Sequence, residues 1–176
     1  MTSSLQANVR SHLRAIPDYP KPGILFQDIT PVLANGALLK EVTDAMAAGY
    51  RDAGITKVVG IEARGFILGS PVALALGTGF VPFRKPGKLP WKLLRREYAL
   101  EYGTNVVEAH ADALTPGDRV LIVDDVLATG GTAAAAAELV GDLGGTLAGW
   151  AFLLELGFLD GKSKLAGGPV QSVVVI

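Results

Sequence analysis

Two adjacent carboxylates and a nearby glycine-rich segment are the residues of this 176-residue chain best suited to chemistry. Asp124 and Asp125 follow four apolar residues, 120–123, and the segment ATGGT occupies positions 128–132. Carboxylates accept hydrogen bonds from hydroxyl groups, whereas adjacent glycines at a helix start let backbone N–H groups surround an anion. The pattern therefore predicts a site for a molecule that carries both hydroxyls and a phosphate, such as a sugar phosphate.

A purely structural explanation of the same segment is that the carboxylates cap a turn and ATGGT starts a helix. Two carboxylates that directly follow buried apolar residues repel each other, and this repulsion destabilises the fold unless a ligand uses them. We therefore favour the ligand site over the structural explanation.

A strand and a helix must hold this segment in place. Residues 119–123 have the apolar character of a buried strand, and the alanine-rich residues 132–143 predict a helix that ends at Gly144. In open α/β sheets, ligands bind beyond the carboxyl ends of the strands, which is where Asp124 and Asp125 are expected to emerge.

The other elements predict an α/β fold with a mostly parallel, twisted sheet flanked by helices. The predicted strands are continuous apolar runs, as expected of strands that are buried on both faces. We expect one domain, residues 1–176, with a small N-terminal region that includes an extended, proline-interrupted segment at 18–31. Further helices are predicted at 4–16, 36–53 and from the turn at 64–65 to residue 77, and further strands at 57–62, 80–83, 146–154 and 170–176.

The composition excludes several classes of function. Sixteen Lys and Arg against 17 Asp and Glu give a net charge of −1, which argues against nucleic-acid or membrane binding through bulk charge. Because the chain has no cysteine and only two histidines, disulfides, thiolate catalysis and cysteine-ligated or all-histidine metal sites are excluded. No apolar signal segment is evident and the uncharged stretch 65–83 is broken by glycine and proline, so we expect a cytoplasmic protein.

Two other segments have compositions that stand out. Residues 84–101 contain six of the 16 basic residues, and composition alone favours a solvated loop there. The sequence GKS at 161–163 is similar to the end of a P-loop, but it lacks the preceding strand and the spacing of that motif. We therefore do not expect a nucleoside triphosphate to bind at 161–163.

Residues 120–132, VLIVDDVLATGGT, closely resemble the phosphoribosyl diphosphate (PRPP) signature of the type I phosphoribosyltransferases. Four further motifs in the expected order resemble the adenine-specific branch of that family. They are DYPKPGILFQDITP at 18–31, GIEARGF at 60–66, RKPGKLP at 84–90 and YALEYG at 98–103. The resemblance covers about residues 5–165. It implies the type I fold and the purine salvage reaction adenine + PRPP → AMP + diphosphate. The cofactor it implies is Mg²⁺, bound through PRPP and water with no protein ligand.

The resemblance also implies how the chain binds PRPP. Asp124 and Asp125 are expected to bind the ribose 2′- and 3′-hydroxyls and to favour positive charge on the sugar. Arg64 is expected beside the diphosphate and the base, in a loop with a non-proline cis peptide. The residues expected to hold the 5′-phosphate are Ala128, Thr129, Gly130, Gly131 and Thr132.

Residues 84–103 resemble the mobile hood of the family, whose closure would exclude water from the site. The hood residues expected to reach the diphosphate, partly across a homodimer interface, are Arg84, Lys85 and Lys88. Glu101 is expected to exchange a proton with adenine N7, and Tyr102 is expected to line the same pocket. Composition alone would make Glu101 an exposed loop residue.

The choice of base is expected to rest on Leu25, Phe26 and Gln27. A main-chain carbonyl there can accept a hydrogen bond from the adenine 6-amino group while a main-chain N–H donates to N1, and Phe26 is expected to pack on the ring. Hypoxanthine and guanine present the opposite pattern, which would leave a buried carbonyl facing an oxygen.

Three alternatives stay open. A phosphoribosyltransferase for another purine, such as xanthine or hypoxanthine, is disfavoured by residues 24–28. A PRPP-sensing regulator that binds nucleic acid would need an extra DNA-binding domain or a basic face, whereas this chain is short and has a charge of −1. A purely structural α/β module would require the Asp124 and Asp125 pair to be accidental.

Overall fold

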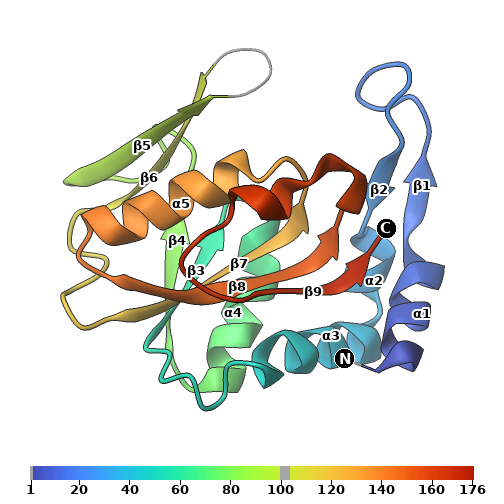
Figure 1. Ribbon diagram of the computed structural model, residues 1–176, viewed down its shortest axis with the longest axis horizontal. Coiled ribbons are helices and arrows are strands. Elements are labelled where there is room, and N and C mark those ends of the chain that lie inside the picture. Colours follow the sequence, from blue (N-terminus) through green and yellow to red (C-terminus); the bar gives the residue numbers. More distant parts are fainter. Residues whose placement is uncertain (1, 100–103) are drawn as a thin grey trace.

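The computed structural model describes residues 2–99 and 104–176 of the chain. At its centre is a five-stranded parallel sheet in the order β4-β3-β7-β8-β9 (Figure 1). The strands are β3 (Lys57–Ile61), β4 (Gly79–Phe83), β7 (Arg119–Leu127), β8 (Thr146–Glu155) and β9 (Val170–Val175). This sheet confirms the predicted α/β class.

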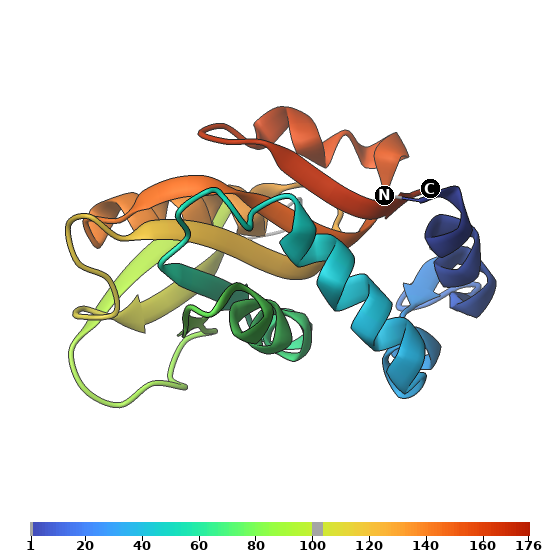
Figure 2. The same ribbon diagram turned by 90° about the horizontal axis from the view of Figure 1, so that it is seen from below.

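Each face of the sheet has its own apolar core, which explains why its strands are continuous apolar runs. Along β7, Leu121 and Val123 belong to one core, whereas Val120 and Ile122 belong to the other. Helices lie on both sides of the sheet (Figures 1 and 2). The first core is closed by α1 (Ser3–His12), α3 (Gly36–Ala48) and α4 (Arg64–Leu76), and the second by α5 (Gly131–Asp142).

The N-terminal region differs from the prediction. Helix α1 ends at His12, and residues predicted to continue it form β1 (Arg14–Ile16), which pairs antiparallel with β2 (Phe26–Asp28). The proline at position 17 restricts the preceding residue to extended backbone, so the strand prevails over the helical spacing of the apolar residues. Within the segment 18–31, the predicted extended backbone gives way to a short helix, α2 (Thr30–Ala34), with proline in its first turn.

Residues 84–101, which we call the basic segment, also contain more regular structure than the sequence predicted. Strand β5 (Leu93–Ala99) pairs antiparallel with β6 (Thr104–His110), so within the described part of the segment, 84–99, irregular backbone is confined to residues 84–92. This hairpin lies over α5 (Figure 1). Arg96 of β5 holds it there, because its Nε and Nη2 donate to the Asp142 carboxylate at 2.5 and 2.7 Å.

Candidate active site

The two adjacent carboxylates lie within β7, which continues to Leu127 and not, as predicted, to residue 123, so both belong to the carboxyl-terminal half of the strand. Asp125 is 5% exposed, and its charge is balanced by Arg64, whose Nε donates to the carboxylate in an ion pair. Arg64 is the first residue of α4, so the end of β3 and the end of β7 meet at this pair. The peptide bond between Glu62 and Ala63 is cis, in the loop where the resemblance implies one.

Asp124 is in a different electrostatic environment from its neighbour. Among residues 2–99 and 104–176, its carboxylate accepts one hydrogen bond, from the Asp125 backbone N–H at 2.9 Å. Burial first, and then the Asp125 charge, raise the pKa of Asp124 well above its ordinary value of 3.8, and the more distant Arg64 offsets only part of this effect. A ligand hydroxyl that donates to Asp124 would favour the charged form, so the carboxylate pair is suited to bind hydroxyl groups.

The 128–132 loop forms a small hollow beside the carboxylate pair. The hollow has a volume of ≈ 90 Å³ and is lined by the whole loop, together with Asp124. The loop leads into α5 through Gly130, which has a φ of +77° that favours glycine. The first-turn N–H groups of a helix carry partial positive charge, so the hollow suits one phosphate group.

The 161–164 segment supports this loop from behind. Gly161 belongs to the 3₁₀ helix η2 (Gly161–Lys164), and a Cβ on it would lie 2.0 Å from the Ala128 carbonyl oxygen. A Cβ on Gly130 would lie 2.3 Å from the Gly161 carbonyl oxygen. The glycine that sequence reasoning set aside as part of a false P-loop is therefore in close contact with the predicted phosphate loop.

A cleft of ≈ 500 Å³ opens in front of the carboxylate pair and continues into the small hollow. Its walls come from segments far apart in the sequence: residues 24–27, the 61–64 turn, the start of the basic segment, the β5–β6 hairpin and the 128–132 loop. The cleft therefore unites most of the residues that the sequence singled out. Those in its lining are Leu25, Phe26, Gln27, Arg64, Arg84, Lys85, Asp124, Asp125, Ala128 and Thr132.

The 25–27 segment forms one wall of this cleft. Phe26 is packed edge-on against Tyr19, with ring centroids 5.2 Å apart, and the Arg64 guanidinium lies 6.0 Å from the Phe26 ring centroid. Strand β2, which contains this segment, has β1 as its one strand neighbour among the described residues. Its other edge therefore has backbone groups that the sheet does not use, as main-chain recognition of a ligand requires.

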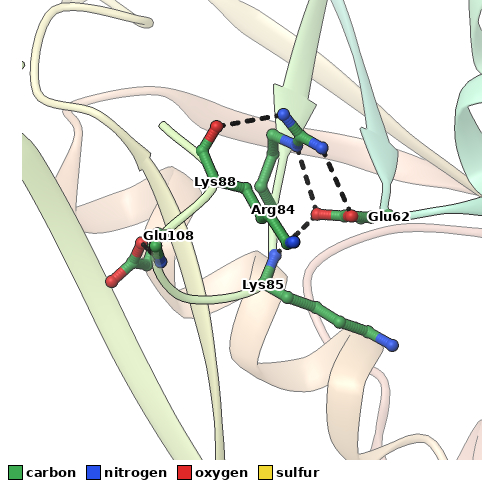
Figure 3. A network of polar contacts seen from close by, with 6 residues as sticks. Glu62, Arg84, Lys85, Lys88 and Glu108 are labelled. Carbon is green, nitrogen blue, oxygen red and sulfur yellow. Dashed lines mark hydrogen bonds and ion pairs between the residues drawn. The ribbon is translucent and has the colours of Figure 1, made fainter. Parts of the chain in front are cut away.

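The basic segment contributes Arg84 and Lys85 to the cleft, but Lys88 does not line it. Arg84 forms two hydrogen bonds with the Glu62 carboxylate, and the Lys88 carbonyl oxygen accepts a third from Arg84 (Figure 3). Glu101 and Tyr102, both predicted for the site, lie outside the described residues.

Sequence reasoning missed three polar residues of the cleft lining, Glu62, Tyr98 and Asn105. Glu62 stands at the carboxyl end of β3, so the rule that identified Asp124 could also have found it. Tyr98 and Asn105 lie on the β5–β6 hairpin, which was not predicted. Tyr98 begins the YALEYG motif, but Glu101 and Tyr102 were the residues of that motif expected at the site, and Asn105 had no sequence signal. Tyr98 also reaches the predicted phosphate loop, because its hydroxyl oxygen accepts a hydrogen bond from the Thr132 hydroxyl at 3.1 Å.

The described parts of the chain, 2–99 and 104–176, contain no group of three or more His, Cys, Asp or Glu side chains arranged to hold a metal ion. Across these same residues, none of the helices is long and apolar enough to span a bilayer.

Comparison with known proteins assigns this arrangement to a family. The model of the phosphoribosyl transferase domain matches residues 28–164. An adenine phosphoribosyltransferase of Myxococcus xanthus is 59% identical over 172 residues, which cover 98% of this chain and 94% of the relative.

Solved structures agree with the sequence relatives. The adenine phosphoribosyltransferase of Rhodothermus marinus superposes with a TM-score of 0.94 at 49% identity and covers 99% of this chain and 100% of its own. The enzyme of Saccharomyces cerevisiae, complexed with an imino-altritol bisphosphate and adenine, superposes with a TM-score of 0.92 at 41% identity, over 98% of this chain and 99% of its own.

Proposed function

The chain belongs to the phosphoribosyltransferase family, among the adenine phosphoribosyltransferases, and from this membership we propose which residues bind each part of the substrates and which take part in the transfer. The enzyme transfers the 5-phosphoribosyl group from PRPP to adenine and gives AMP and diphosphate, a step of purine salvage. One observation supports this function best. A single cleft joins a carboxylate pair for sugar hydroxyls, a hollow for one phosphate and an exposed strand edge for a base.

The chemical step is a displacement at the anomeric carbon of the ribose. The bond from C1 to the diphosphate oxygen breaks, and the N9 lone pair of adenine forms the new bond to C1. In our proposal the imidazole proton of adenine passes from N7 to the Glu101 carboxylate. Positive charge develops on the sugar in the transition state. The Asp124 and Asp125 carboxylates, which bind the 2′- and 3′-hydroxyls in our proposal, favour that charge because they are fixed in place before the reaction.

The phosphate groups are bound at two places in this proposal. The 5′-phosphate occupies the hollow formed by the 128–132 loop, where backbone N–H groups and threonine hydroxyls are available. The diphosphate lies toward Arg64, Arg84 and Lys85, all of which line the cleft. Lys88 joins them when the hood closes, in part from the partner subunit of a homodimer.

The base binds against the 25–27 segment. Phe26 packs on the purine ring, and the main chain of Leu25 and Gln27 distinguishes the 6-amino group and N1 of adenine from those of 6-oxopurines. Glu101 exchanges a proton with N7, and Tyr102 completes the pocket.

Mg²⁺ is the cofactor of this proposal, and the residues of the cleft fit it. The donors present are carboxylate oxygens, which Mg²⁺ prefers, yet the described residues offer no group of three ligands. An ion that keeps several waters and binds mainly to substrate phosphates suits such a site. When bound, it reduces the negative charge of the diphosphate.

We also propose that residues 1–176 form one catalytic domain, with a base-recognition segment at 18–31 and a hood at 84–103, and that two copies form a homodimer. Exposed apolar side chains on α4 support the dimer, because Ile67 is 47% exposed and Leu74 is 82% exposed. The proposed location is the cytoplasm, because PRPP and AMP are multiply charged and a lipid bilayer excludes them.

A panel of bases tests the function. Purified protein is incubated with PRPP and Mg²⁺ and, in parallel, with adenine, hypoxanthine, guanine or xanthine, and nucleotide formation is followed. We expect AMP from adenine and no product from the other bases. Product from a 6-oxopurine would overturn the proposed base pocket, and PRPP binding without any product would favour a PRPP sensor instead.

A further inference from the structure

A carboxylate faces the basic residues at the place proposed for the diphosphate. Strands β3 and β4 are parallel neighbours in which Ile61 pairs with Phe83, and the Glu62 N–H donates to the Phe83 carbonyl at 2.9 Å. The next residues along the two strands, Glu62 and Arg84, therefore emerge side by side at the carboxyl edge of the sheet, and both line the cleft.

Glu62 makes three hydrogen bonds with the basic segment (Figure 3). Its Oε2 accepts from Arg84 Nε at 3.1 Å and from the Lys85 backbone N–H at 3.0 Å, and its Oε1 accepts from Arg84 Nη2 at 3.3 Å. Burial by itself would raise the pKa of Glu62, but these donors and the Lys88 charge outweigh it and hold the pKa below 4.5. Glu62 is thus a charged centre around which the basic segment is arranged.

A second carboxylate fixes the other end of the same segment. Glu108 of β6 is 2% exposed, accepts a hydrogen bond from the Gly87 N–H at 3.1 Å and pairs with Arg95 at 3.2 Å. Its backbone N–H and carbonyl both bond to the backbone of Arg84 at 2.8 Å. The turn at 84–88 is therefore fixed by two carboxylates, those of Glu62 and Glu108, and Glu62 is the one that lines the cleft.

A negative charge beside a diphosphate would weaken binding if it had no other effect. Three basic residues lie within five positions of the chain: Arg84, Lys85 and Lys88. Like charges this close repel one another, and a nearby opposite charge offsets the repulsion. The Arg84 guanidinium has five N–H donors, of which Glu62 uses two and the Lys88 carbonyl uses one. None of the described residues accepts a hydrogen bond from the other two donors, so these can serve a ligand while the side chain is held in place.

We propose that Glu62 is a positioning residue for the transfer reaction: its carboxylate holds Arg84 and the turn at Lys85 in the arrangement that binds the diphosphate. This inference rests on the proposed diphosphate position and assigns Glu62 a part in forming it. Glu62 acts through Arg84 and touches neither the sugar nor the base. The order of the segment, and not the net charge of the cleft, sets the affinity for diphosphate.

The substitution Glu62→Gln separates these two effects because they predict opposite signs. If order dominates, the KM for PRPP and the inhibition constant of inorganic diphosphate rise about tenfold, since a neutral amide replaces charge-assisted hydrogen bonds. The KM for adenine stays within twofold. If net charge dominates, PRPP and diphosphate bind more tightly to the variant, and that result, like an equal rise in both KM values, would overturn the proposal.

A double-mutant cycle then tests whether Glu62 acts through Arg84. In an Arg84→Gln background, Glu62→Gln should cause less than a twofold further change, whereas a full tenfold effect there would contradict the mechanism. Glu62→Asp retains the charge with a shorter reach, and its KM for PRPP should fall between those of the wild type and Glu62→Gln. Glu41→Gln, at an exposed position of α3, is the matched control and should leave both KM values unchanged.

Calorimetric titration with inorganic diphosphate supplies a readout that needs no turnover. If the wild-type protein forms no AMP, the proposed function fails, but weaker diphosphate binding by Glu62→Gln would still support the role of Glu62. Circular dichroism and thermal unfolding of each variant establish that the compared proteins are folded. Equal diphosphate affinity of folded wild type and Glu62→Gln would overturn the inference.

Discussion

Asp124 and Asp125 are adjacent in sequence, yet within the part of the chain that the structure describes the charge of Asp125 is balanced by an ion pair and that of Asp124 is not. Arg64 forms an ion pair with Asp125, whereas the Asp124 carboxylate accepts a hydrogen bond from a backbone N–H. Burial and the Asp125 charge raise the pKa of Asp124, so ionising this group costs the folded protein free energy. A ligand hydroxyl that donates to Asp124 would offset part of that cost.

This leads to a prediction for Asp124→Asn. Below pH 3.8, the ordinary pKa, Asp124 is protonated in both the folded and the unfolded chain. Its burial then does not lower the free energy of unfolding through a buried charge. As the pH rises through 3.8, the unfolded chain loses the proton first, so the wild type loses stability until the pH exceeds the raised pKa of the folded state. The free energy of unfolding of the variant, relative to wild type, should therefore increase with pH over this window, as measured by urea unfolding.

The same variant should lose activity while it keeps or gains stability. Removing one charge that stabilises the transition state costs roughly 10²-fold in kcat. Combining it with Asp125→Asn should lower turnover further. Near-wild-type turnover of the double variant would contradict the ribose assignment, and a pH-independent stability difference would contradict the electrostatic account.

Glu101 carries a separate prediction. If it exchanges a proton with adenine N7, Glu101→Ala should lower kcat by about 10²-fold and leave PRPP affinity almost unchanged. Rapid-quench measurement of AMP formation, together with PRPP titration, separates the two quantities. A large loss of PRPP affinity would instead locate Glu101 at the diphosphate.

At the scale of elements, the 128–132 loop depends on a neighbour that is remote in sequence. The helix η2 has no side chain at Gly161, and this lets its backbone approach the loop directly. The loop geometry that binds a phosphate is thus set partly by α5, which follows it, and partly by a segment about 30 residues further along the chain.

Gly161→Ala should therefore impair phosphate binding although residue 161 touches no substrate. Its Cβ would lie 2.0 Å from the Ala128 carbonyl oxygen, so the loop must move. We expect the KM for PRPP to rise roughly ten- to a hundredfold, in keeping with the effect of an ångström-scale misplacement, while the KM for adenine changes little.

The control for this variant is Gly141→Ala in α5, because a Cβ there meets no atom within 4 Å. It should leave both KM values unchanged and slightly stabilise the helix. An unchanged KM for PRPP in Gly161→Ala would show that the loop tolerates displacement of this neighbour.

The elements that sequence reasoning predicted well are those with a strong local signal. Strands β3, β7 and β8 contain apolar runs because both faces of the sheet are buried, and the carboxylates of β7 together with the 128–132 loop indicate the site. The β5–β6 hairpin was missed because charged residues such as Arg95 and Arg96 dominate its first strand, and their partners lie on β6 and α5. No local pattern reveals such long-range pairs.

The residues that line the cleft were likewise predictable from the sequence only where they are close together in the chain. Asp124 and the 128–132 loop follow one another in the chain, so their union was predictable, whereas the pairing of Glu62 with Arg84 depends on the order of the strands. Tyr98 could not be placed at the loop without knowledge of the hairpin. The family resemblance, and not composition, supplied the roles expected of the basic segment.

At the scale of the whole molecule, α4 has an exposed apolar face. Ile67 and Leu74 are seven residues apart, so both lie on one face of the helix, away from the sheet. Burial of this face against a second copy would remove two large apolar side chains from water. This is the surface to which our dimer proposal assigns the contact.

Leu74→Glu should consequently weaken the dimer. In sedimentation equilibrium we expect the wild type at twice 18.3 kDa and the variant shifted toward the monomer, with a dissociation constant raised at least tenfold. Phe158→Glu changes a residue that is 75% exposed in η1 (Gly157–Leu159) and serves as the control. A monomeric wild type would contradict the dimer, and an unaffected Leu74→Glu would relocate the contact.

The hydrogen bond between Tyr98 and Thr132 joins the β5–β6 hairpin to the loop proposed for the 5′-phosphate. A phosphate that takes the Thr132 hydroxyl competes with Tyr98 for it, and linkage makes such competition reciprocal. Phosphate binding therefore weakens the contact between the hairpin and the loop by the same free energy by which that contact weakens phosphate binding. AMP retains the 5′-phosphate after transfer, so the same competition with Tyr98 would act on the product as well as on PRPP.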